Sequence, residues 1–173
     1  MKTKAILLVT AVASAMALAI LPADAAAPAK PQAPNPRLNK AIDLKFTSVD
    51  GKEVDLASLK GKVVLIDFWA TWCGPCVAEL PNVLKAYEKL HTKGFEIVGI
   101  SLDSDKSKLE AFTKEKGMTW PQFFDGKGWK NEISTGFDIH SIPAMWLVDK
   151  NGKLVSTTVR GKLEAEVEKY LKR

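Results

Sequence analysis

The feature that most constrains the fold is a pair of apolar runs joined by one helical segment. Residues 63–69 form a continuous run of apolar and β-branched side chains, and residues 95–102 form a second run of strand length. Such runs are typical of strands that are covered on both faces of a sheet. Between them, apolar residues recur at helical spacing from Cys76 to His91, and Gly94 then ends the helix. This order predicts one β-α-β unit.

The remaining segments extend this unit on both sides. An Asp50-Gly51 turn between apolar residues predicts an N-terminal β-hairpin, and Asn151-Gly152 predicts a second hairpin between strands at 144–148 and 154–159. After the β-α-β unit we expect a polar helix capped by Asp103-Ser104-Asp105, then a short strand and a short helix. An amphipathic helix is expected at the C-terminal end of the chain.

The first 25 residues have the three parts of a secretory signal peptide. Lysines lie among the first four residues, an apolar run extends from Ala5 to Leu21, and Ala23-Asp24-Ala25 supplies the small-x-small pattern for cleavage. We therefore expect residues 1–25 to be removed on export to the periplasm. The alternative is an uncleaved membrane anchor, because the apolar run only just reaches the length of a membrane span.

Composition divides the rest of the chain into a linker and one domain. Residues 26–41 are rich in proline and alanine and have almost no large apolar side chains, so they predict a disordered linker. Residues 42–173 have the size of a single ordinary domain. The formal net charge of +5 arises from 25 basic and 20 acidic residues mixed along the chain. This mixture does not favour a nucleic-acid partner.

Both cysteines of the chain lie in one Cys73-Gly74-Pro75-Cys76 sequence at the junction of the first strand and its helix. No cysteine is left for a structural disulfide, so the pair indicates redox chemistry. Free backbone N–H groups and the positive end of the helix dipole would stabilise a thiolate on Cys73, which we expect to be the nucleophile. Cys76, one turn further along and predicted to be less exposed, would be the resolving thiol of a Cys73–Cys76 redox-active disulfide.

Two other interpretations of this cysteine pair are half of a zinc site and a pair of unreactive core thiols. Zinc would need two further ligands, and the remaining candidates of the usual kind are His91, at the far end of the helix, and His140. Inert core thiols do not suit an exposed turn that is rich in glycine and proline. We therefore expect no metal and no cofactor.

Two motifs in this chain resemble those of the thioredoxin superfamily. The stretch from Asp67 to Cys76 is similar to the active-site segment of thioredoxins, and Ser141-Ile142-Pro143 is similar to their cis-proline loop. The N-terminal hairpin, Glu79 and the extra segment between the two halves resemble the exported TlpA/ResA-type reductases. The resemblance extends from Ile42 to the C-terminus. It implies a thioredoxin-like three-layer α/β/α sandwich with an N-terminal β-hairpin and a central insertion.

The resemblance also implies which residues contact the partner. The bond before Pro143 would be cis, and its loop would face the cysteines and present backbone to an extended peptide. The implied substrate-binding residues are Trp72, Gly74, Pro75, Ile142 and Pro143. Ala144 follows the proline where a threonine is frequent in the family, so partner preference does not carry over. Three further tryptophans, Trp120, Trp129 and Trp146, are interpreted as packing residues.

Two carboxylates are candidates for proton transfer. By resemblance, Asp67 matches the buried aspartate behind the thiols of thioredoxin, where burial would raise its pKa and let it take a proton from Cys76. Glu79 is three positions after Cys76 and can lie beside the same thiol. The alternatives are a hydrogen-bonded structural group for Asp67 and a solvated acid in the first helical turn for Glu79. We expect at least one of them to handle the proton.

The predicted function is that of a thiol-disulfide oxidoreductase. The resemblance implies a monomer that reduces disulfide-bearing exported proteins and is itself reduced by a membrane-bound electron donor. A disulfide oxidase or isomerase is an alternative, because the direction depends on a reduction potential that a sequence does not quantify. A redoxin-type peroxidase would need Thr or Ser at position 70, where this chain has Ala70. The non-enzymatic alternative is a client-binding module for cytochrome maturation.

The signal peptide can be tested directly. N-terminal sequencing of the protein recovered from the periplasm of an expressing bacterium should begin close to residue 26, because the cleavage pattern ends at Ala25. A recovered chain that begins at Met1 would contradict cleavage and favour the membrane anchor.

Overall fold

The computed structural model describes residues 35–173. The predicted signal peptide and residues 26–34 of the predicted linker lie outside the described residues. Within 35–173, none of the helices combines the length and the apolar character needed to cross a bilayer.

The strands and α-helices follow the predicted order. Among residues 35–173 they are β1 (Lys45–Thr47), β2 (Glu53–Asp55), β3 (Val63–Trp69), α1 (Gly74–Leu90), β4 (Phe95–Ser101), α2 (Lys106–Lys116), β5 (Gln122–Phe123), α3 (Glu132–Gly136), β6 (Ala144–Val148), β7 (Leu154–Ser156) and α4 (Leu163–Leu171). Short 3₁₀ turns, η1 (Leu56–Leu59), η2 (His91–Lys93) and η3 (Gly128–Lys130), connect some of them.

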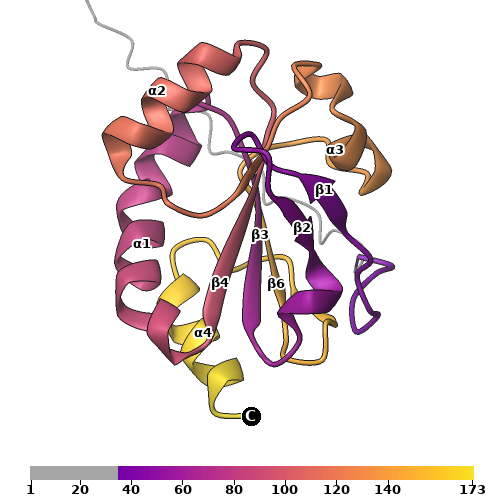
Figure 1. The fold of residues 1–173 in the computed structure, drawn as a ribbon. Coiled ribbons are helices and arrows are strands. Elements are labelled where there is room, and N and C mark those ends of the chain that lie inside the picture. The colour runs from indigo at the N-terminus through magenta and orange to yellow at the C-terminus, as the bar shows by residue number, and fades with distance from the viewer. Residues whose placement is uncertain (1–34) are drawn as a thin grey trace, which may run out of the picture. The chain divides into compact units, whose positions relative to one another are not determined.

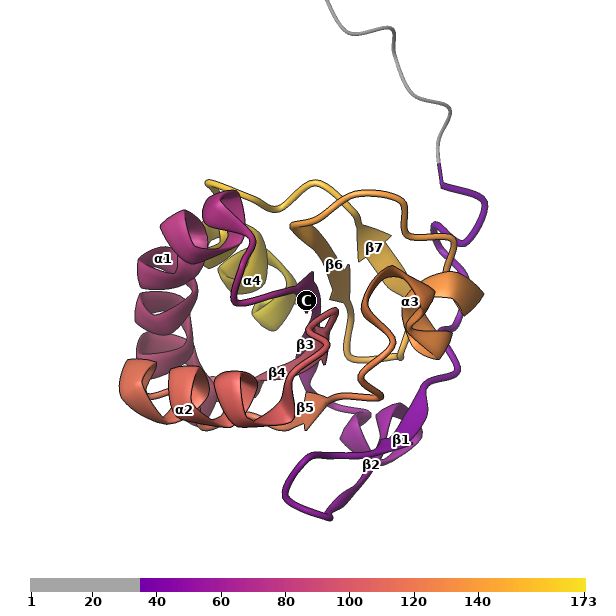
Figure 2. The ribbon, with the colours of Figure 1, turned by 90° about the horizontal axis from the view of Figure 1, so that it is seen from above.

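A five-stranded sheet forms the centre of the domain. Its strand order is β5-β4-β3-β6-β7, with β3, β4 and β5 parallel and with β6 and β7 antiparallel to their neighbours. Helices α1, α2 and α4 lie on one side of the sheet and α3 lies on the other (Figures 1 and 2). The predicted three-layer α/β/α sandwich, with its hairpin and central insertion, is confirmed.

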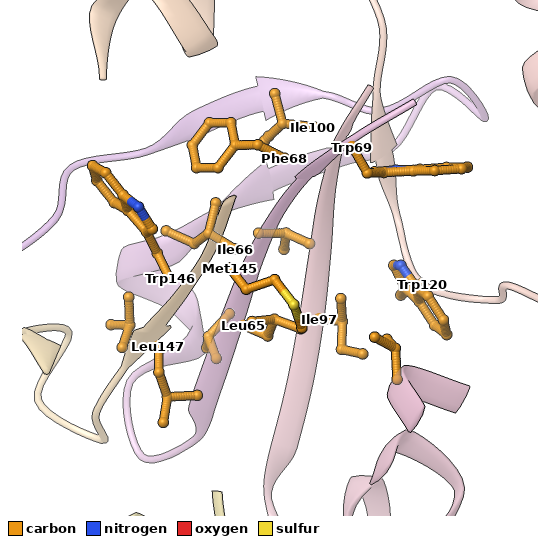
Figure 3. Close-up of a cluster of buried hydrophobic side chains, with 14 of the residues drawn as sticks. Leu65, Ile66, Phe68, Trp69, Ile97, Ile100, Trp120, Met145, Trp146 and Leu147 are labelled. Atoms are coloured by element: carbon orange, nitrogen blue, oxygen red, sulfur yellow. The ribbon is translucent and has the colours of Figure 1, made fainter. Parts of the chain in front are cut away.

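The two central strands are buried because both faces of the sheet are covered. Every residue of β3 is buried, and so are six of the seven residues of β4. Figure 3 shows the apolar side chains that these strands and β6 contribute to the core, among them Leu65, Phe68, Ile97, Ile100 and Trp146. Asp67 interrupts this run with a carboxyl group, which makes it an exception that needs a functional reason.

Local capping sets the limits of the helices around the site. Helix α2 begins where the side chain of Asp105 accepts a hydrogen bond from the backbone N–H of Lys108, and it ends at Gly117 in the left-handed conformation, with φ of 70°. The segment after α1 ends in the same way at Gly94, with φ of 99°. Both glycines stand where other residues would be strained.

The N-terminal hairpin covers the edge of the central sheet. Strands β1 and β2 pair as a separate antiparallel sheet, and Phe46 packs edge-on against Phe123 of β5 with ring centroids 5.5 Å apart. The backbone N–H of Val49 donates to the carbonyl of Gln122 at 2.8 Å. The hairpin therefore protects a strand whose outer edge would otherwise be free to pair with another chain.

Part of the predicted linker belongs to the folded domain. The guanidinium of Arg37 donates to the carbonyl of Gly136 at 2.8 Å, and the backbone N–H of Asn39 donates to the carbonyl of Leu154 at 2.7 Å. Ala41 forms a single bridge with Lys153. Ordered structure therefore begins before the predicted boundary at residue 42, through these hydrogen bonds and through Leu38, which is partly buried and packs against the core.

Gly99 of β4 provides a test of packing behind the site. A Cβ atom at this position would lie 2.6 Å from Cδ of Gln122, whose Oε1 accepts a hydrogen bond of 3.0 Å from the indole N–H of Trp69. We predict that Gly99→Ala lowers the free energy of unfolding by about 1–3 kcal/mol through overpacking, as measured by urea denaturation.

A double-mutant cycle distinguishes this clash from a general loss of sheet stability. Gln122→Ala removes the atoms that the new methyl group would meet, so the double variant should lose less stability than the two single losses added together. Additive losses would contradict the prediction.

Candidate active site

The junction between β3 and α1 positions the two cysteines. The backbone N–H of Leu102 donates to the carbonyl of Trp69 at 2.8 Å, which ties the end of β3 to the end of β4. The chain then turns outward, and Cys73 becomes the N-terminal cap of α1. Cys73 and Cys76 are joined by a disulfide, as the sequence predicted.

The surroundings of Cys73 suit a thiolate. The backbone N–H of Cys76 donates to Sγ of Cys73 at 3.2 Å, and Pro75 occupies the first turn, where a missing N–H costs nothing. The positive end of the helix dipole acts on the same sulfur. These contacts would stabilise a thiolate on Cys73 once the disulfide is reduced.

Exposure does not separate the two cysteines in the disulfide form. Cys73 is 5% exposed and Cys76 is 7% exposed, so the prediction that Cys76 is the less exposed of the two is wrong in this state. What separates the cysteines is their neighbours, since Cys76 borders an inner cavity with both predicted carboxylates.

This inner cavity has a volume of 10 Å³ and brings together residues from distant parts of the chain. Its lining includes Asp67 of β3, Cys76 and Glu79 of α1, and Pro143 of the loop before β6. Asp67 is 7% exposed and Glu79 is 8% exposed, so both carboxyl groups are buried beside the inner sulfur. The solvated position considered for Glu79 is therefore wrong.

Burial raises the pKa of Asp67 to about 7, and the negative charge of nearby Glu79 raises it in the same direction. Oε1 of Glu79 accepts a hydrogen bond of 2.9 Å from the backbone N–H of Gly161, in the loop between β7 and α4. Asp67 can therefore accept or release a proton near neutral pH. Glu79 is held in place by the backbone of a loop that lies 82 positions later in the sequence.

The predicted partner-binding residues lie around the cysteines. The peptide bond between Ile142 and Pro143 is cis, and Pro143 lines the cavity behind Cys76. Ile142 and Pro143 are half-buried, whereas Gly74 and Pro75 are exposed at the tip of the helix. The side chain of Trp72, directly before Cys73, is 54% exposed.

Sequence reasoning missed the position of Trp129. It was interpreted as a packing residue, but it is 49% exposed, and its ring centroid lies 6.1 Å from that of Trp72. Trp120 and Trp146 are buried, as predicted. The Gly-rich surroundings of Trp129 in the sequence were the available signal for a surface loop.

Asp103 is a second residue whose position differs from the expectation. It was grouped with the cap of α2, but Asp105 alone provides the side-chain cap. The carboxylate of Asp103 instead accepts hydrogen bonds from the backbone N–H and the hydroxyl of Thr71, the latter at 2.6 Å. Asp103 follows the carboxyl end of a parallel strand, where ligand-binding and active sites tend to form in α/β sheets. This position was the signal in the sequence that Asp103 lies near the site.

The chain is similar to known proteins both in sequence and in structure. The family model described as Redoxin matches residues 29–172. Thiol-disulfide oxidoreductase ResA of Bacillus anthracis is 35% identical over 134 residues, which cover 78% of this chain and 76% of that protein.

Solved structures of the same kind share the fold. The thioredoxin domain of a thiol-disulfide oxidoreductase from Bacteroides vulgatus aligns with a TM-score of 0.68 at 33% identity, covering 76% of this chain and 94% of that one. A thiol:disulfide interchange protein of the thioredoxin family from Chlorobium tepidum aligns with a TM-score of 0.67 at 27% identity, covering 78% of this chain and 97% of that one.

The raised pKa of Asp67 makes stability depend on pH. The native state favours the protonated carboxyl of Asp67. The stability that this preference contributes is complete below the unfolded-state pKa of about 3.9, and it is lost as pH rises through about 7. We predict that Asp67→Asn is more stable than the wild type at pH 8, and that its advantage is smaller at pH 5 by up to about 3 kcal/mol.

Urea denaturation of the disulfide form at the two pH values measures this difference. Asp43→Asn changes an exposed aspartate to the same amide and should leave the pH dependence unaltered. An equal advantage of Asp67→Asn at both pH values would show that the Asp67 carboxyl titrates normally.

Proposed function

Because this chain belongs to the Redoxin family and is a thioredoxin-like thiol-disulfide oxidoreductase of the ResA type, we propose that it reduces the disulfides of exported proteins. The observation that carries the proposal is the asymmetry around the two cysteines. Cys73 caps a helix that stabilises its thiolate, and Cys76 borders a cavity with two buried carboxyl groups. This arrangement suits an outer nucleophile and an inner resolving thiol.

The reaction begins from the dithiol form. The thiolate of Cys73 attacks one sulfur of the partner's disulfide, forming a mixed disulfide and releasing the partner's other sulfur as a thiolate, which takes a proton from water. The free N–H groups and the positive end of the helix dipole stabilise the negative charge of this thiolate.

The second step returns the chain to its disulfide form. Cys76 loses its proton and attacks Sγ of Cys73, which forms the Cys73–Cys76 bond and releases the partner's remaining sulfur. Two electrons have then passed from the dithiol to the partner. Asp67, with a pKa of about 7, is the acceptor for the Cys76 proton, and burial together with the charge of Glu79 keeps that pKa high.

The surface around the cysteines supports an extended partner. Trp72, Gly74 and Pro75 adjoin the cysteines in the chain, and Ile142 precedes Pro143, which lines the cavity behind Cys76; we assign partner binding to these residues. The cis-proline loop offers backbone to the peptide that carries the target disulfide.

Continued turnover needs a source of electrons and access to exported clients. We propose that residues 1–25 direct the chain to the periplasm and that a membrane-bound dithiol donor reduces the Cys73–Cys76 bond after each cycle. The protein acts in this scheme as a monomer. The basis for export is the pattern of a basic start, an apolar run and a cleavage site.

Cysteine variants test the exchange. With insulin as the disulfide substrate, Cys73→Ser should lower the reduction rate by about 1,000-fold or more, because the nucleophile is lost. Cys76→Ala should stop after one step and accumulate a mixed disulfide that reducing agents release. The sequence has two cysteines, so any trapped bond in Cys76→Ala must involve Cys73.

The direction of the reaction is tested separately. Equilibration with glutathione should give a reduction potential below about −200 mV, nearer to that of thioredoxin than to that of DsbA. A potential close to −120 mV would assign the chain to oxidation instead, while full insulin reduction by Cys73→Ser would refute the exchange mechanism.

A further inference from the structure

Two tryptophans form an exposed apolar surface beside the disulfide. Trp72 and Trp129 are the large hydrophobic side chains that are exposed among the described residues, at 54% and 49%. Their ring centroids lie 6.1 Å apart, with the ring planes inclined by 54°. Trp72 directly precedes Cys73, so a partner whose sulfur reaches Cys73 must come close to this pair.

A buried network of hydrogen bonds holds the backbone near each of the two tryptophans. Thr71, next to Trp72, donates to the carboxylate of Asp103, which also accepts from the hydroxyl of Ser101 at 2.8 Å. Asn131, two residues after Trp129, donates from its side-chain amide to the carbonyl of Ser101 at 3.0 Å. Ser101 and Asn131 are fully buried, and Asp103 is 2% exposed. Both tryptophans are therefore attached to the same rigid end of β4.

The turn that carries Trp129 is also fixed by its glycine. Gly128 has a left-handed backbone with φ of 56°, and a Cβ atom there would lie 3.2 Å from Oγ of Ser104. The turn η3 therefore packs closely against the loop between β4 and α2. An aromatic ring held in place before binding loses little conformational freedom when a partner covers it.

The charges beside Trp129 do not explain its exposure. Lys127 lies 3.7 Å from the carboxylate of Asp125 and 3.6 Å from that of Glu132, so its charge is largely compensated within the loop. What the loop presents beside the disulfide is the indole ring. Paired aromatic rings offer apolar area with defined geometry, which suits an apolar side chain of a partner.

We propose that Trp129 is a specificity-determining residue that, together with Trp72, docks a large apolar side chain next to the reactive cysteine of a partner protein. This inference rests on the proposed function, since it names the chemistry of the partner segment that the same site reduces. The occupant is an extended protein segment with a Phe, Leu or Met neighbouring its disulfide cysteine. The contact selects among partners and leaves the exchange at the sulfur atoms unchanged.

The test compares three disulfides in reaction with the reduced protein. Two are synthetic peptide disulfides that differ in one residue, Phe or Ser, beside the cysteine, and the third is 2-hydroxyethyl disulfide. The wild type should reduce the Phe peptide about tenfold faster than the Ser peptide, in second-order rate constant. Trp129→Ala should lose about this factor on the Phe peptide while reacting normally with the Ser peptide and with 2-hydroxyethyl disulfide.

Matched variants separate the ring from its surroundings. Trp129→Phe keeps an aromatic ring and should retain most of the preference for the Phe peptide. Trp129→Gln keeps a long side chain without apolar area and should lose the preference as Trp129→Ala does, which provides a second test if one variant folds poorly. Lys130→Ala changes the exposed neighbour and should leave all three rates as in the wild type.

Other outcomes overturn the inference in distinguishable ways. An equal loss on all three disulfides would give Trp129 a structural role, and unchanged rates on every disulfide would remove it from partner selection. If sedimentation shows a wild-type dimer that Trp129→Ala abolishes, a second copy of the chain is the occupant and the inference is wrong. Failure of the wild type to reduce any disulfide would count against the proposed function itself.

Discussion

The burial of β3 is the constraint on which the rest of the structure depends. Its pairing with β4 on one side and β6 on the other leaves every one of its residues inside the domain. The chain can leave the sheet only at the end of the strand, where Trp69 is tied to Leu102. Helix α1 must therefore begin at the surface, with its free N–H groups directed at Cys73, and the chemistry of the outer sulfur follows from this position.

The same burial places a carboxyl group where it lowers stability. Asp67 lies in an apolar strand, and the charge of Glu79 adds to the effect of desolvation on its pKa. A protein selected for stability alone would replace Asp67 by an apolar residue, because a buried carboxylate without a partner is unfavourable. Its presence beside Cys76 fits the proposed mechanism, in which a proton must be accepted during resolution.

The parts that were predictable from the sequence are those determined by local pattern. The apolar run of β3 and the helix after Cys73 each have a signature within a short segment, and both are found where they were expected. The cis bond before Pro143 was implied by the resemblance to thioredoxins, and it is also found. The glycines around Trp129 were a local signal for a surface turn, but the contact of its ring with Trp72 was not predictable in this way, because it depends on how the turn docks on the end of β4. The ordering of residues 35–41 rests on hydrogen bonds to distant backbone and on the packing of Leu38 against the core, which composition does not report.

The disulfide closes a loop between residues only three positions apart. Cross-links stabilise proteins mainly by limiting the disorder of the unfolded chain, and this effect grows with the length of the enclosed segment. Opening so small a ring therefore changes chain entropy little, and the domain has no other covalent tie among its cysteines. The cysteine pair can thus give up two electrons when the bond forms and take them back when it opens, without the bond also being a structural brace.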